Sequence, residues 1–193
     1  MAPVAYEDAE RAVKARLGES AAAHSLRTAE TAASLARTYG VDEDKARLGG
    51  LLHDWDRERK KRDLVGLARE LGVEVTEADE AAPKLLHART GAVGAARALP
   101  GLPDDVVQAI SRHTVGAADM TDLDKVVYLA DMMEPARDFP GVTELRAAAG
   151  VLTLDKLFAL GYQQSICHLV TARKRLHPDT VAVWNAIVAG ERR

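Results

Sequence analysis

The chain has 193 residues, of which 47% are apolar and 28% charged, a composition typical of a globular protein with one core. Its formal net charge of −3 excludes the broad basic surface with which proteins bind nucleic acid, and taken alone it argues against a polyanionic ligand. The single cysteine, Cys167, excludes an internal disulfide and suits a reducing compartment. Because the first thirty residues contain acidic side chains and no apolar run, we expect no signal peptide, no membrane span and a cytoplasmic location.

Residue usage favours helices along the whole chain. Aromatic residues make up only 4%, alanine is abundant, and no hairpin signal or long alternating strand occurs. We therefore predict an all-α fold, a single domain over residues 1–193 with a core at roughly 20–135 and C-terminal helices at 142–190 that pack on it. A homodimer is compatible with the alanine-rich helix faces.

In chain order, apolar spacing predicts about nine helices, near residues 7–17, 20–39, 43–54, 64–71, 85–99, 103–113, 122–134, 154–173 and 179–189. Gly40 and Gly72 are placed as C-terminal stops, and Asp42 is placed as an N-cap. Thr121 followed by Asp124 resembles a capping box. These local signals fix where several of the helices begin and end.

Two segments fall outside this pattern. The run Arg57-Glu58-Arg59-Lys60-Lys61-Arg62 is a block of charge, and we interpret it as a solvated loop. Residues 73–82 are polar without helical spacing, and we expect them to be irregular.

The histidines carry the chemical signal, because those at 24, 53, 87 and 113 fall at helix ends or inside apolar helices. His53 and Asp54 end one helix, and both reach one ion only if further ligands arrive from other helices. His24 suits that role, as does Asp131, whose carboxylate would be costly to bury unpaired. Two imidazoles and two carboxylates form a set suited to octahedral iron, manganese or cobalt with two open positions. Such an ion supports hydrolysis without a catalytic serine or cysteine.

Several strings follow one another in the order of a known family: Gly50-Leu51-Leu52-His53-Asp54, Leu86-His87, Arg112-His113-Thr114, Asp124 through Tyr128-Leu129-Ala130-Asp131 to Glu134-Pro135, Arg137, Phe139-Pro140-Gly141-Val142 and His177-Pro178-Asp179-Thr180. From about residue 6 to residue 187 the chain resembles the bacterial HD-domain symmetrical diadenosine tetraphosphatases of the YqeK type. The His-Asp pair alone is shared by the whole HD superfamily. The segment from Arg112 to Val142, together with the late Pro-Asp-Thr, is more distinctive.

The resemblance implies an all-helical HD-domain enzyme that splits diadenosine tetraphosphate, a small nucleotide, into two ADP molecules with iron as its metal. By matching positions, the metal ligands would be His24, His53, Asp54 and Asp131. The substrate contacts would be Arg57, His87, His113, Thr114, Arg137, Arg175, Leu176, His177, Pro178, Asp179 and Thr180, so that the C-terminal helices complete the nucleotide pocket. Asp54, His87 and His113 would act in catalysis, the two histidines by donating to phosphate oxygens or protonating the departing ADP.

Other roles stay open for some of these residues. His87 and His113 could instead bind a second metal bridged by Asp54, or cap helices. The segment that begins at His177 could instead be a plain interhelical turn, and Arg175 could lie at a solvated helix end without contacting substrate.

The chain departs from the family pattern three residues before the first metal histidine. Ala21 stands where the family usually has an arginine, and Arg27, one helical turn beyond His24, could approach the same pocket. Gly116-Ala117-Ala118-Asp119 also lacks the expected Arg-Pro-Gly character. Two alternatives follow: another HD-type phosphohydrolase acting on a deoxynucleotide, cyclic dinucleotide or guanosine alarmone, or a nucleotide-binding regulator without turnover, which Ala21 favours.

Overall fold

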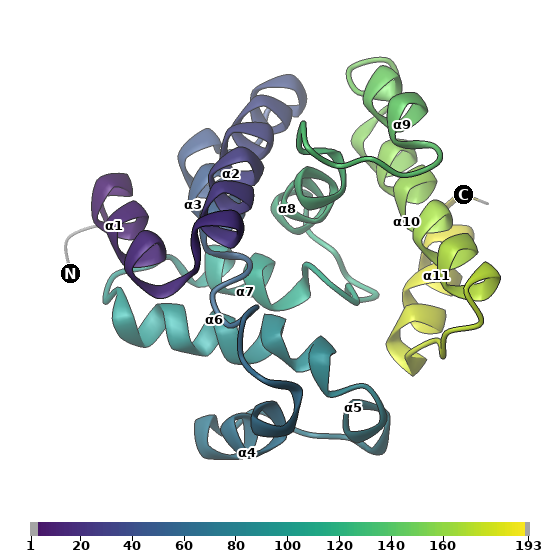
Figure 1. Ribbon diagram of the computed structural model, residues 1–193. Coiled ribbons are helices and arrows are strands. Elements are labelled where there is room, and N and C mark those ends of the chain that lie inside the picture. Colours follow the sequence, from purple (N-terminus) through teal and green to yellow (C-terminus); the bar gives the residue numbers. More distant parts are fainter. Residues whose placement is uncertain (1–3, 192–193) are drawn as a thin grey trace.

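Helices account for all the regular secondary structure over residues 4–191, the part of the chain that the computed structural model describes (Figure 1). They are α1 (Tyr6–Arg16), α2 (Glu19–Tyr39), α3 (Glu43–Leu52), α4 (Lys61–Leu71), α5 (Glu77–Ala81), the 3-10 helix η1 (Pro83–Leu85), α6 (Leu86–Ala98), α7 (Asp104–Arg112), α8 (Asp122–Met133), α9 (Val142–Ala148), α10 (Leu154–Thr171) and α11 (Pro178–Glu191). The prediction of an all-α fold is confirmed, and every expected helix is present.

The helix ends follow the predicted local chemistry. The Asp42 carboxylate accepts a hydrogen bond from the Lys45 N–H at 3.0 Å and caps α3. Thr121 and Asp124 form both hydrogen bonds of a capping box at the start of α8. Gly40 ends α2 with a φ of 71°, a left-handed conformation that a residue without a Cβ adopts at little cost.

The helices beyond the predicted nine are short. The expectation of irregular backbone over residues 73–82 was wrong for α5, which a capping box of Thr76 and Asp79 opens. Helix α9 has only seven residues and follows Gly141, whose φ is 97°. Elements of this length carry too few apolar positions to show a period.

Helices α2, α3 and α8 form the centre of the molecule, with α6 and α7 packed beneath them in Figure 1. The close approach of α2 and α3 depends on Gly50, because a Cβ there would lie only 2.8 Å from the Thr28 carbonyl oxygen and 3.0 Å from Ala29 Cα. Gly49 likewise leaves room for Val127 of α8. This tight packing brings the C-terminal end of α3 against the neighbouring helices.

Two smaller parts flank this centre, as Figure 1 shows: α4 and α5 on one side, and α10 and α11 on another. In the first, Leu64 and Ala68 of α4 pack against Leu86 of α6 in a separate small apolar cluster. In the second, α10 packs on α8, α9 and α11. None of the helices in the described part of the chain is long and apolar enough to cross a membrane.

Candidate active site

Five helices bring their functional side chains to one point in the centre of the molecule. His24 lies on α2, His53 and Asp54 directly follow α3, and Asp131 lies in the last turn of α8. His87 is the second residue of α6, and His113 directly follows α7. All but His24 and Asp131 are buried. These residues, widely separated in sequence, form one cluster, which we call the His-Asp cluster.

The four side chains expected to bind metal point their donor atoms at one another. His24 Nε2 lies 3.0 Å from Asp131 Oδ1, 3.2 Å from His53 Nε2 and 3.7 Å from Asp54 Oδ2. His53 Nε2 lies 3.4 Å from Asp54 Oδ2 and 3.6 Å from Asp131 Oδ1. His24, His53 and Asp131 thus form one group with metal-ligand spacing, and Asp54 Oδ2 lies beside the two histidines of that group.

The other ring nitrogen of each buried histidine is held by the backbone. Nδ1 of His53 donates to the Gly50 carbonyl at 2.7 Å, Nδ1 of His87 to that of Lys84 at 2.6 Å, and Nδ1 of His113 to that of Ile110 at 2.7 Å. Because a carbonyl only accepts, Nδ1 carries the proton, and Nε2 is left to face the cluster. A histidine ligand is commonly oriented in this way.

The pair His24 and His53 shows that this donor set fits a cation. Their Nε2 atoms lie 3.2 Å apart, where two lone pairs repel unless a proton or a metal lies between them. Two imidazole nitrogens with two carboxylates match a divalent first-row metal. The His-Asp cluster can therefore hold a divalent metal.

The charges within the cluster also indicate that it can hold a divalent metal. Burial lowers the pKa of His53, but the charge of Asp54 and the hydrogen bond with Asp131 outweigh burial and raise it to about 10. Burial raises the pKa of both carboxyl groups, yet the surrounding histidines hold each pKa well below its usual range. Both carboxylates are thus ionised, and without metal a proton on His53 compensates part of their charge.

Asp54 also faces a second pair of histidines. Its Oδ1 lies 3.0 Å from His87 Nε2 and 3.7 Å from His113 Nε2, while its Oδ2 faces His24 and His53. His53, Asp54 and His113 form a second group with metal-ligand spacing. Burial lowers the pKa of His113, and the neighbouring charge on His53 adds to this effect. Asp54 therefore joins the two halves of the cluster.

A buried acid that our sequence interpretation assigned no role lies behind His24. Glu134 Oε1 is 3.1 Å from His24 Nδ1, and Glu134 Oε2 accepts from Arg27 Nε at 2.6 Å. Arg27, expected to approach the substrate pocket, is thus engaged by Glu134 behind the cluster. Ala21 packs against the core on the same helix and supplies no cation. The Glu134-Pro135 pair shortly after Asp131 is the only sequence signal that marks this residue.

Two arginines expected to bind phosphate flank the cluster. Arg137 donates through Nε to the Asp131 carbonyl at 2.8 Å, and its Nη2 contacts the Asp131 carboxylate and lies 3.3 Å from His24 Nε2. Arg57 Nε lies 3.9 Å from Asp54 Oδ2, and the arginine side chain is half exposed. Both guanidinium groups therefore stand at the open side of the ligand set.

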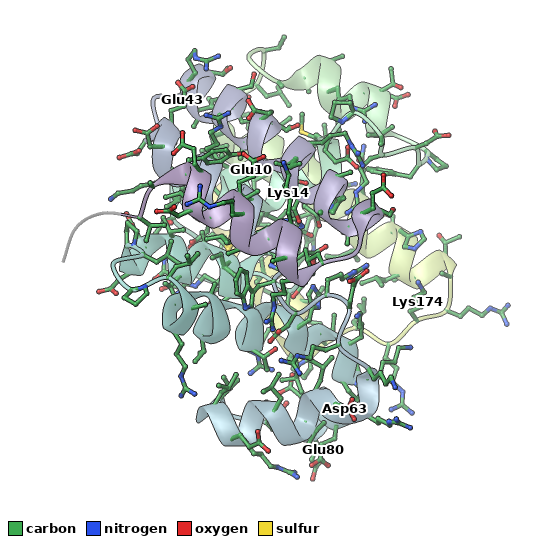
Figure 2. The ribbon with its side chains drawn as sticks, turned by 60° about the vertical axis from the view of Figure 1, so that its left-hand side comes forward. Glu10, Lys14, Glu43, Asp63, Glu80 and Lys174 are labelled. Carbon is green, nitrogen blue, oxygen red and sulfur yellow. The ribbon has the colours of Figure 1, made fainter. Side chains whose placement is uncertain are left out.

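A cavity of about 1180 Å³ opens beside the cluster, between the α4–α5 side and the α10–α11 side of the molecule. Figure 2 labels Asp63 and Glu80 on the first side and Lys174 on the loop between α10 and α11. Of the expected substrate contacts, the cavity is lined by Arg57, His113, Thr114, Arg175, His177 and Thr180. Leu176, Pro178 and Asp179 are exposed and lie outside that lining. Its size suits a ligand larger than a mononucleotide.

Comparison with known proteins places these residues in a family context. The model of the HD domain matches residues 21–136. The chain is similar to two proteins named bis(5'-nucleosyl)-tetraphosphatase, symmetrical. The protein from Halalkalibacterium halodurans is 34% identical, and the match covers 91% of this chain and 93% of that protein. The protein from Bacillus subtilis is 32% identical, and the match covers 95% of this chain and 98% of that protein. A crystal structure titled as a predicted HD superfamily hydrolase involved in NAD metabolism, from Clostridium acetobutylicum, superimposes with a TM-score of 0.91 at 32% identity, covering 98% of this chain and 100% of that one.

Proposed function

The chain belongs to the HD-domain family and, within it, to the symmetrical bis(5'-nucleosyl)-tetraphosphatases, and from this premise we propose that it hydrolyses diadenosine tetraphosphate to two ADP molecules. The observation that carries the proposal is the convergence of His24, His53, Asp54 and Asp131 beside one large cavity, whose wall includes Asp131. The cavity has the volume for a dinucleotide, and the C-terminal helices supply one of its walls.

His24, His53, Asp54 and Asp131 would hold a divalent metal, which would supply Lewis acidity and make a bound water molecule more acidic. We assign iron to this site, with manganese and cobalt as alternatives that suit the same mixed nitrogen and oxygen set. Asp54 contributes Oδ2 to this set and keeps Oδ1 for the histidines on its other side.

Protein side chains perform the remaining steps. His113 is buried with its lowered pKa and its Nδ1–H held by Ile110, so its Nε2 accepts a hydrogen bond and orients the attacking water. Arg57 binds a phosphate oxygen beside the cluster, and Arg137 exchanges its contact with Asp131 for phosphate as negative charge develops.

His87 is placed to act as the acid. Its Nδ1 faces the Lys84 carbonyl and its Nε2 faces the ionised Asp54, two acceptors that only the doubly protonated ring satisfies. The water oxygen bonds to one of the two central phosphorus atoms, the bond from that phosphorus to the bridging oxygen breaks, and His87 gives its Nε2 proton to the departing ADP.

The test is product separation after purified protein, loaded in turn with iron, manganese or cobalt, is incubated with diadenosine tetraphosphate. We expect ADP as the sole nucleotide product. ATP plus AMP would refute symmetrical cleavage, and binding without hydrolysis under every metal would favour the regulator. Asp54→Asn should abolish turnover, whereas Asp63→Asn, which removes the same charge at an exposed position of α4, should not.

A further inference from the structure

The cavity has a charge opposite to that of the whole chain. Five cationic side chains line it, Arg57, Lys61, Lys84, Lys174 and Arg175, against a single carboxylate, Asp131, which belongs to the His-Asp cluster. The chain as a whole has a formal net charge of −3. A polyanion is therefore attracted to this part of the surface although the protein is acidic overall.

Four of these five cations, Lys61, Lys84, Lys174 and Arg175, have no ionic partner within the described residues. Neither Lys61 nor Lys84 lies within ion-pairing distance of a carboxylate there, although their neighbours do: Arg57 Nε lies 3.9 Å from Asp54, and Arg62 Nε lies 3.5 Å from Asp63. The basic run that we interpreted as a solvated loop is solvent-exposed, but the loop interpretation was wrong for Lys61 and Arg62, which begin α4. Arg57 and Lys61 from this run line the cavity. Their charges are available to a ligand.

Arg57, Lys84 and Lys61 lie close to one another. Arg57 stands beside Asp54, and the Lys84 ammonium donates to the Arg57 carbonyl. Burial first, and then the charges of Arg57 and Lys61, lower the pKa of Lys84. These groups repel one another in the absence of a bound anion, and an anion among them would relieve that repulsion.

The start of α4 carries several positively charged residues, although acidic residues are preferred at the N-terminus of a helix. Lys60 is the N-cap, Lys61 and Arg62 are the first two helical residues, and the cap makes no side-chain hydrogen bond. Acidic residues, such as Asp63 in the first turn of α4, are favoured at this end because the helix dipole is positive there. The three basic residues reduce the stability of the helix. Departures of this kind occur where a sequence serves function. An anion bound beside Lys61, the only one of these three residues that lines the cavity, offsets both the dipole and the charge of that lysine.

We propose that Lys61 and Lys84 form a phosphate subsite for the part of the phosphate chain that lies beyond the His-Asp cluster, and that this subsite makes the enzyme select long phosphate chains. The proposal deepens the function proposed above and rests on it. Because the ionised Asp54 and Asp131 already offset the charge of a divalent ion, Arg57 and Arg137 neutralise only part of a tetraphosphate, and the two ammonium groups supply the remainder. A single phosphate held at the cluster does not extend to them.

The test compares Lys61→Gln and Lys84→Gln with Lys60→Gln, a matched control that removes the same charge from the adjacent exposed residue, which does not line the cavity. Calorimetry on metal-loaded protein measures binding of inorganic tripolyphosphate and of inorganic phosphate, and steady-state kinetics measure KM for diadenosine tetraphosphate. We expect each cavity variant to weaken tripolyphosphate binding and raise KM roughly tenfold, with phosphate binding unchanged and the control within about twofold of wild type. Lys61→Arg, which keeps the charge, should restore most of the loss.

Equal behaviour of all three glutamine variants would overturn the subsite, as would equal loss of phosphate and tripolyphosphate binding. Thermal melting checks that each variant is folded, which matters most for Lys84 because its ammonium binds the Arg57 carbonyl. Failure of the proposed function looks different: wild type would produce no ADP, while the difference between Lys61→Gln and Lys60→Gln in tripolyphosphate binding would persist and support the subsite.

Discussion

Replacement of Gly50 by alanine tests whether the contact between α2 and α3 builds the metal site. A Cβ at this position would lie 2.8 Å from the Thr28 carbonyl oxygen, 3.0 Å from Ala29 Cα and 3.0 Å from Ala32 Cβ. Two of these neighbours are backbone atoms, so a side-chain rotation cannot relieve the clash. The helices must move apart by a few tenths of an ångström.

This displacement has an energetic cost and a functional one. Overpacking of a tight core contact costs about 1–3 kcal/mol, and the better helix propensity of alanine returns up to about 1 kcal/mol. At about 2–4 °C per kcal/mol for a chain of this size, we expect the melting temperature to fall by roughly 3–6 °C. Because the Gly50 carbonyl also holds His53 Nδ1, the shift moves His53 away from His24 and weakens metal binding.

Thermal denaturation of the metal-free protein and a metal titration measure the two effects. Gly66→Ala is the matched control, because Gly66 is exposed on α4 and a Cβ there meets nothing within 4 Å. It should raise the melting temperature slightly, since alanine is favoured over glycine by about 0.5–1 kcal/mol in a helix, and leave metal affinity unchanged. A Gly50→Ala protein as stable as Gly66→Ala, with wild-type metal affinity, would refute the reasoning.

Two further predictions concern metal affinity. Glu134→Gln should weaken metal binding by roughly 10–100-fold, because it removes the charge behind His24 Nδ1. Glu144→Gln, at an exposed position of α9, should leave metal binding unchanged. A competitive chelator titration measures both affinities, and equal values would contradict the role of Glu134. Apparent metal affinity should also rise with pH from 6 to 8, by roughly tenfold per unit, because the pKa of His53 in the metal-free protein is about 10 and the metal must displace that proton. The carboxylates, whose pKa values lie far below this window, add no slope. An affinity independent of pH would show that His53 is not a ligand.

Local signals in the sequence were sufficient for most helices. Asp42 caps α3 and Thr121 with Asp124 caps α8 because these hydrogen bonds involve residues three apart, which a sequence displays directly. The same pattern of threonine and aspartate opens α5, at Thr76 and Asp79. Because this segment lacks apolar spacing, periodicity alone does not predict a helix there. In a helix too short to show apolar periodicity, the capping residues predict its start better than the apolar spacing does.

Tertiary partners were harder to predict. Arg27 lies one helical turn from His24, which pointed to the pocket, yet Glu134, more than a hundred residues later, engages it. Lys61 and Lys84 line one cavity only because α4 and η1 pack side by side, so no spacing in the sequence relates them. Which of these residues become neighbours depends on how the helices pack. The composition of the sequence gives only the average charge of the chain.

Hydrolysis in water enriched in oxygen-18 tests the central claim most directly. With metal-loaded protein and diadenosine tetraphosphate, the account predicts ADP as the sole product, with one labelled oxygen in one of every two ADP molecules, on the terminal phosphate, and no reaction with Asp54→Asn. ADP without label would exclude direct attack by water. Labelled AMP or ATP would exclude symmetrical cleavage. Turnover by Asp54→Asn would exclude the His-Asp cluster as the site of hydrolysis.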